Sequence, residues 1–233
     1  DRTPLAPMTE ETLTALRALH PEQPHADQLT LPADMAPYRF RVPAIGIEEV
    51  TAYVRSRQRR SAGGPSGWTF DMLKDFILVD EAATRGLARL ATLIARDEIR
   101  SADIKAKLKA SRLIPLAKPG GGTRPIAIGE VFTRIASGVV CRALSSEIRT
   151  FLGPRQFAAP GYKAGAEALV HTTRALVSGN PHFLTVKIDI KNAFNCVDRV
   201  ALLRVLKDHP SLHGLVPYFT FAYLTQSDLR VPQ

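Results

Sequence analysis

Near residue 190, a carboxylate follows a run in which apolar and polar residues alternate. Residues 183–190 have a period of two, which predicts a β-strand with one apolar and one polar face. Asp189 lies on the polar face, beside Thr185 and Lys187. Aspartate is uncommon in strands, so Asp189 is a candidate metal ligand; a helix cap and simple solvent exposure are the alternatives.

Two basic residues flank a glycine-rich turn. Residues 111–118 and 123–128 are short, β-compatible segments joined by proline and glycine, which predicts a β-hairpin. Lys118 and Arg124 stand on either side of its tip. A lysine point charge and an arginine fork together suit a triphosphate; an ordinary solvated hairpin is the alternative.

Basic residues gather in two further places. Between residues 100 and 124, seven basic residues are opposed by Asp103 alone. The candidate nucleic-acid contacts within this stretch are Lys105, Lys107, Lys109 and Arg112. A second cluster comprises Arg55, Arg57, Arg59 and Arg60. Because 31 Lys and Arg outnumber 22 Asp and Glu, for a net charge of +9, a polyanion is the expected partner; solvated helix faces are the alternative reading of both clusters.

The elements that must position these residues are mostly helical. Apolar spacings of three and four predict helices over residues 9–19, 47–60, 68–76, 80–99, 130–148, 165–177, 198–207 and 212–224. Thr9 and Asp198 are the expected caps of the first and seventh helices, and Gly138 costs its helix about 1 kcal/mol relative to alanine. Pro115 and Pro125 predict that both hairpin strands lie at sheet edges. Helices with a few short strands predict an α+β fold.

Composition bears on disulfide bonds, cysteine metal sites and cellular location. Cys141 and Cys196 are the two cysteines and are far apart, so the sequence predicts no disulfide partner and no cysteine metal site. No apolar run approaches the roughly 18 residues of a membrane span, and the first residues lack the order of a signal peptide. We therefore expect no membrane partner and an intracellular protein, nuclear if the host is eukaryotic.

Four sequence blocks occur in the order found in reverse transcriptases. They comprise residues 61–68, 112–126, 161–167 and 187–195. In the last block, Asp189 is followed five residues later by Phe194, which resembles the first catalytic motif of that family. The 112–126 block resembles the fingers block of that family. The sequence around Phe194 is similar to that of reverse transcriptases from non-LTR retrotransposons. Many relatives have Asp where this chain has Asn195, and no catalytic role is assigned to that position.

The resemblance implies an RNA-directed DNA polymerase whose partners are an RNA template, a DNA primer and a dNTP. In that family the aspartate binds two Mg²⁺ ions and the next backbone carbonyl binds one, which assigns metal binding to Asp189 and Ile190. The aromatic blocks a ribose 2′-hydroxyl, which makes Phe194 a sugar gate. Lys118 and Arg124 would hold the phosphates of the incoming nucleotide.

The resemblance also implies a right-hand polymerase layout. The expected parts are an N-terminal extension over 1–60, fingers over 61–180 and the start of a truncated palm, with an incomplete antiparallel sheet, over 181–233. The family completes its metal site from an aromatic-x-Asp-Asp hairpin, and no adjacent aspartate pair occurs here. We therefore expect the chain alone to be inactive. The alternatives are a group II intron maturase-type polymerase, and a non-catalytic RNA-binding module or decayed element copy.

Overall fold

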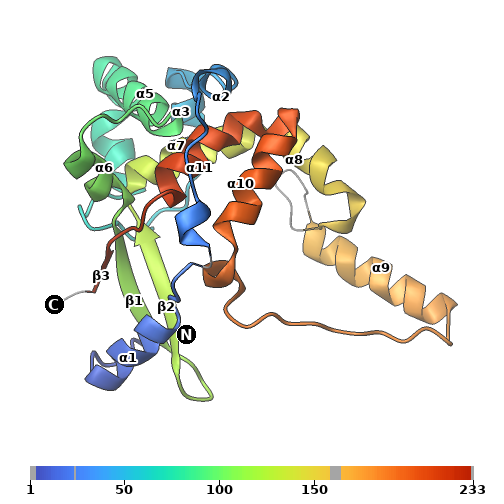
Figure 1. The fold of residues 1–233 in the computed structure, drawn as a ribbon. Coiled ribbons are helices and arrows are strands. Elements are labelled where there is room, and N and C mark those ends of the chain that lie inside the picture. Colours follow the sequence, from blue (N-terminus) through green and yellow to red (C-terminus); the bar gives the residue numbers. More distant parts are fainter. Residues whose placement is uncertain (1–3, 24, 158–163, 232–233) are drawn as a thin grey trace.

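A computed structural model describes residues 4–23, 25–157 and 164–231. The helices are α1 Glu10–Ala18, α2 Ala36–Phe40, α3 Ile47–Arg55, α4 Phe70–Met72, α5 Glu81–Ala95, α6 Ala102–Lys109, α7 Val131–Ala143, α8 Ser145–Leu152, α9 Gly165–Gly179, α10 Arg199–Asp208 and α11 Val216–Tyr223. The strands are β1 Ser111–Ala117, β2 Thr123–Gly129 and β3 Leu229–Arg230. This mixture of many helices and a small sheet confirms the α+β prediction (Figure 1).

Local capping explains where several helices begin. The Thr9 hydroxyl accepts from the Thr12 amide, and the Asp198 carboxylate accepts from the amides of Val200 and Ala201, as the sequence predicted. Asp80 caps α5 in the same way. Each cap satisfies amide groups that have no partner within the first helical turn.

Five of the predicted helices differ in detail from the observed ones, among them the helix expected over 80–99, which ends at Ala95. The helix expected over 47–60 ends at Arg55, and the one expected over 68–76 continues from α4 into a π-helical turn at Leu73–Ile77. The long helix expected over 130–148 is divided at Leu144 into α7 and α8. The last helix begins with a 3-10 segment, Pro210–Leu215.

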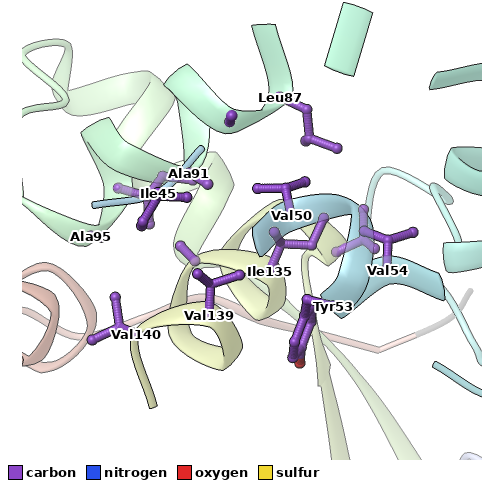
Figure 2. Close-up of a cluster of buried hydrophobic side chains, with 14 of the residues drawn as sticks. Ile45, Val50, Tyr53, Val54, Leu87, Ala91, Ala95, Ile135, Val139 and Val140 are labelled. Carbon is purple, nitrogen blue, oxygen red and sulfur yellow. The ribbon is translucent and has the colours of Figure 1, made fainter. Parts of the chain in front are cut away.

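The main hydrophobic core lies between α3, α5 and α7 (Figure 2). Val50 and Val54 of α3, Ile94 of α5 and Ile135 of α7 are fully buried. Burial of a large aliphatic side chain stabilises a fold by about 1.5–3 kcal/mol, so these contacts account for much of its stability. Because α3 contributes to this core, residues 47–55 pack with the segment predicted as fingers, although the predicted domain boundaries themselves stay untested.

Gly138 lies beneath an aromatic ring in this core. A Cβ built at Gly138 would lie 2.0 Å from the Cζ atom of Tyr53, too close for any side chain. Tyr53 also meets Phe70 edge-on, with ring centroids 6.1 Å apart. A Cβ at position 138 would therefore force the Tyr53 ring or α3 to shift, which accounts for a glycine in the middle of this helix.

A second, smaller core joins α10 to α11. It comprises Leu203, Leu206, Leu212, Val216 and Phe219. Phe221 of α11 points into the main core instead, so α11 connects the two clusters.

The sheet has the strand order β2-β1-β3. β1 pairs with β2 antiparallel from Ser111–Gly129 to Ala117–Thr123, which confirms the hairpin, and with β3 in parallel at its first two residues. The far end of β1 meets the N-terminal segment, where the Ala6 amide donates to the Pro115 carbonyl at 3.0 Å. β1 is thus the central strand, and the prediction of an edge position at Pro115 is wrong because residues distant in the sequence cover that side.

The strand predicted over residues 183–190 does not form. The segment runs as an extended connection between α9 and α10, outside the helical body (Figure 1). Its apolar side chains are exposed to solvent, including Leu184 at 88% and Ile188 at 81%. A single strand is not stable without a neighbour to accept and donate backbone hydrogen bonds, and none of the described strands pairs with it. The antiparallel palm sheet expected here is therefore absent from the described residues, whose sheet is the mixed one around β1.

Candidate functional site

Asp189 lies in this extended segment and is exposed to solvent. Among the described residues, no group of three or more His, Cys, Asp or Glu side chains is arranged to hold a metal ion. Two Mg²⁺ ions need several oxygen ligands, so the described donor set does not by itself fit a two-metal site. Asp189 and the adjacent Ile190 carbonyl have suitable donor chemistry, but the metal assignment stays a prediction.

The turn after Asp189 is held by the N-terminal segment. Asn192 adopts a left-handed backbone conformation, with φ of 57°, and begins the 3-10 turn Ala193–Cys196. The side-chain amides of Asn192 and Asn195 both donate to the Leu19 carbonyl at 2.8 Å. Sequence reasoning missed this contact because its partners are more than 170 positions apart.

Phe194 is the most exposed large apolar residue of that turn, at 96%, and it lines a groove of about 640 Å³. The other walls come from the N-terminal segment, the base of the hairpin, and α10 and α11: His20, Pro21, Glu22, Gln23, Ser111, Ala127, Asn195, Val197, Arg199, Leu202, Phe219, Tyr223, Gln226, Ser227 and Leu229. A groove of this size accommodates a ligand as large as a nucleotide. The role of Phe194 as a residue that faces a nucleotide stays a prediction.

Arg199 is a cation in this groove that the sequence analysis did not single out. Its guanidinium lies 5.5 Å from the ring centroid of Tyr223 and donates to the Tyr223 carbonyl at 3.2 Å. Burial lowers the pKa of Arg199 below its usual value, and the Tyr223 hydroxyl partly opposes this effect. The groove therefore combines an exposed aromatic ring with a partly desolvated positive charge.

Lys118 and Arg124 lie at the other end of the hairpin. The Lys118 amide donates to the Gly122 carbonyl, and its carbonyl accepts from Gly121, which closes the tip. Both side chains are exposed, so the structure brings the two cations to one tip as predicted from the sequence. Lys118 is seven residues, or roughly 20 Å, from the groove residue Ser111, and Arg124 is three residues, or roughly 10 Å, from the groove residue Ala127, so neither cation lines the groove with Phe194.

Arg142 of α7 joins the four arginines at and just after the end of α3. Arg57 and Arg142 lie over the ring of Tyr53, with 4.5 Å and 5.0 Å between guanidinium carbon and ring centroid. Arg142 also donates to the Ser56 hydroxyl at 2.6 Å. Arg55, Arg59 and Arg60 are exposed around this pair. Arg142 was missed because it is 86 positions from Ser56 in the sequence.

The predicted basic track along residues 105–112 is only partly exposed. Lys107 is exposed, whereas Lys105 forms an ion pair with Asp97 and Arg112 is half-buried. Lys109 is buried, contrary to the exposed helix face expected from the sequence. Its ammonium donates to the Thr225 carbonyl at 2.8 Å and to the Thr225 hydroxyl at 2.5 Å. It therefore connects α6 to the segment after α11 and does not form part of the exposed track.

Burial shifts the pKa values of Lys109 and Cys141, and neighbouring charges add to the shift at Lys109. Burial, and next the charges of Lys105 and Arg199, lower the pKa of Lys109 from 10.5 to about 8. Burial raises the pKa of the Cys141 thiol, and both Cys141 and Cys196 are free. Cys141 thus has the environment of an unreactive packing residue.

Part of the third sequence block lies outside the described residues, namely residues 161–163. The rest of the block, residues 164–167, leads into α9, where Gly165 lies close to the backbone of Phe157. A Cβ at Gly165 would lie 1.8 Å from the Phe157 carbonyl oxygen, so glycine is required there. Glu167 lies in the first turn of α9, where a carboxylate complements the helix dipole.

Comparison with known proteins relates this chain to a retrotransposon protein. No protein-family model matches the chain. The chain is 28% identical over 171 residues to the Retrotransposable element SLACS 132 kDa protein of Trypanosoma brucei gambiense. The sequence is related to a retrotransposon protein. The alignment covers 71% of this chain and 14% of that relative, so the chain corresponds to a small part of it. Among the described residues, no helix is long and apolar enough to span a membrane.

Proposed function

We propose that this chain is the nucleotide-gripping part, with the first metal-binding carboxylate, of an RNA-directed DNA polymerase from a non-LTR retrotransposon. The observation that carries the proposal is the turn after Asp189, which presents Phe194 to a groove of nucleotide size. The relation to a retrotransposon protein supports it, as does the order of the four sequence blocks.

Each candidate residue has a stated role in this proposal. Asp189 and the Ile190 carbonyl are ligands for Mg²⁺, which in nucleotidyl transfer stabilises the attacking and leaving oxygens. Because the described residues offer one such carboxylate, we assign the chain no catalytic step of its own. Phe194 tests the sugar of the dNTP, and Lys118 and Arg124 bind its phosphates; this last assignment rests on the sequence resemblance alone, because the structure holds the hairpin tip apart from the groove that Phe194 lines.

The proposal assigns the basic surfaces to nucleic acid. The arginines around Tyr53, including Arg142, and the exposed Lys107 contact the backbone of the RNA template or the DNA primer. Such contacts weaken steeply with salt, because each neutralised phosphate releases counterions.

Primer extension by the full-length protein tests the metal role. Asp189→Asn keeps the size of the side chain but removes a charged ligand, and it should lower the rate of synthesis by about 10³-fold or more. RNA affinity should stay within about twofold, since Asp189 carries no positive charge. The matched control is Asp208→Asn, an exposed aspartate at the end of α10, which should leave synthesis unchanged.

Substantial synthesis by the Asp189→Asn protein would exclude the metal role of Asp189. Absence of synthesis by the unsubstituted full-length protein would instead favour a non-catalytic RNA-binding module, in agreement with the lack of a group of three or more His, Cys, Asp or Glu metal ligands among the described residues.

A second measurement tests the hairpin. Lys118→Ala and Arg124→Ala should each raise the apparent KM for dNTP by about tenfold, because each removes one charged contact to the triphosphate. An effect confined to template affinity would reassign the hairpin to nucleic-acid binding.

A further inference from the structure

The contact between the N-terminal segment and the turn that carries Phe194 is made by three side-chain amides. The Asn195 amide donates one N–H to the Leu19 carbonyl at 2.8 Å and the other to the Asn192 side-chain oxygen at 2.9 Å. The Asn192 amide donates to the same Leu19 carbonyl. From the other side, the Gln23 amide donates to the Asn195 backbone carbonyl at 3.2 Å. We call this set of residues, Leu19, Gln23, Asn192 and Asn195, the amide clasp.

The clasp requires amides at these positions. Leu19 follows the last turn of α1, where backbone carbonyls have no partner within the helix. A carbonyl oxygen can accept two hydrogen bonds, and here both come from asparagine side chains. An aspartate at 195 could donate none and would direct a negative charge at two oxygen acceptors. Only an amide at position 195 can donate both hydrogen bonds, although aspartate differs from asparagine by a single group.

The N-terminal segment is itself anchored to the hairpin. The Leu5 backbone pairs with Leu116 of β1, and the Ala117 amide donates to the Pro4 carbonyl at 3.0 Å. At the end of α1, the His20 ring nitrogen Nδ1 lies 2.8 Å from the Leu16 carbonyl. The N-terminal segment is therefore hydrogen-bonded both to β1 and to the turn that follows Asp189.

The same segment forms one wall of the groove that Phe194 lines. His20, Pro21, Glu22 and Gln23 all contribute to that wall. The aromatic ring is 96% exposed and has little packing of its own, so the backbone of its turn determines where it lies. The clasp is what holds that backbone.

We propose that the amide clasp makes residues 19–23 a positioning element for Phe194 and thereby determines how strictly the site distinguishes deoxyribonucleotides from ribonucleotides. This inference rests on the proposed function. Asn195 and Gln23 are positioning residues in it, since they act through the turn and not on the nucleotide.

The test compares Asn195→Asp with Asn180→Asp in the full-length protein. The control residue also donates its side-chain amide to a backbone carbonyl, that of Leu176 at 2.9 Å, but lies at the end of α9 and outside the clasp. Hydrogen exchange should be about tenfold faster in residues 192–196 of the Asn195→Asp protein, a factor that corresponds to the loss of one or two hydrogen bonds. Residues 17–23 should show the same increase, and Asn180→Asp should change neither segment.

The functional measurement is the ratio of kcat/KM for dNTP to that for the matching rNTP. Asn195→Asp should lower this ratio by about tenfold, in the same direction as Phe194→Ala, with kcat for dNTP changed much less. A merely structural role would lower both kcat/KM values equally and leave the ratio unchanged. Gln23→Glu provides a second variant, on the other side of the clasp, in case Asn195→Asp does not fold.

The outcomes separate the two proposals. Unchanged exchange, or an unchanged nucleotide ratio, in both clasp variants overturns the positioning role even if Asp189→Asn abolishes synthesis. An unchanged ratio in Phe194→Ala also overturns it, because the clasp would then have no gate to position. Synthesis that survives Asp189→Asn overturns the metal role of Asp189, and the exchange measurement still shows whether the clasp exists.

Discussion

Ile135 and Ile188 are the same residue type in opposite environments. Ile135 of α7 is fully buried between α3 and α5, whereas Ile188, next to Asp189, is 81% exposed. A helix satisfies its backbone hydrogen bonds internally and needs a partner only for its apolar stripe, which neighbouring helices provide here. The segment 183–190 has a period suited to a strand but has no paired neighbour among the described residues. The comparison shows that a helical core can be complete while the candidate catalytic segment has no neighbouring strand among the described residues.

The largest expected effect tests the two isoleucines directly. Ile135→Ala should lower the free energy of unfolding by about 2–5 kcal/mol, because it removes buried atoms and leaves a cavity. Ile188→Ala should change it by less than about 0.5 kcal/mol, since the side chain is already in water. Urea unfolding of this chain measures both. Equal losses would contradict the difference in burial.

A second prediction tests how closely the core is packed. Gly138→Ala should destabilise the protein by about 1–3 kcal/mol, because its Cβ would overlap the Tyr53 ring. The matched control is Gly86→Ala in α5, where a Cβ meets nothing within 4 Å. That substitution should stabilise the protein by about 0.5–1 kcal/mol through helix propensity. Thermal and urea unfolding distinguish the two signs, and a neutral Gly138→Ala would mean that the Tyr53 ring or α3 shifts at little cost.

The smallest expected effect extends the comparison to two lysines of one helix, the buried Lys109 and the exposed Lys107. Because the pKa of Lys109 falls from 10.5 to about 8 on folding, the unfolded chain binds more protons between these pH values. Stability from this group therefore rises as the pH increases above about 8. The free energy of unfolding of the natural protein, relative to Lys109→Met, should rise by roughly 1 kcal/mol from pH 8 to 9.

The control for the pH measurement is Lys107→Met, which removes an exposed lysine of the same helix. A flat difference between the natural protein and Lys109→Met would show that the Lys109 ammonium keeps its usual pKa in the folded chain.

Sequence reasoning was most successful where structure depends on near neighbours. The caps at Thr9 and Asp198 and the hairpin around Gly121 all formed as predicted. They depend on contacts within a few residues, which the local sequence specifies. The order of elements and the α+β class follow from these local signals.

Prediction failed where a distant partner decides the outcome. The alternating segment ending at Ile190 could not reveal whether a neighbouring strand exists. The positive charge of Lys109 indicated an exposed face, but Thr225, more than 100 positions away, supplies oxygen acceptors that allow its burial. Nothing in the local sequence distinguished Asn195 as a donor to Leu19.

For the candidate site, the sequence by itself determined the chemistry available: the carboxylate of Asp189, the aromatic ring of Phe194, and the paired cations Lys118 and Arg124. Residue type and local spacing carry that information. Tertiary structure alone decided that the N-terminal segment holds the Phe194 turn, that Arg142 joins the arginines of α3, and that hairpin tip and groove lie apart. The physical reason is that hydrogen bonds and ring contacts act over a few ångströms, and only folding brings residues 86 to 176 positions apart within that range.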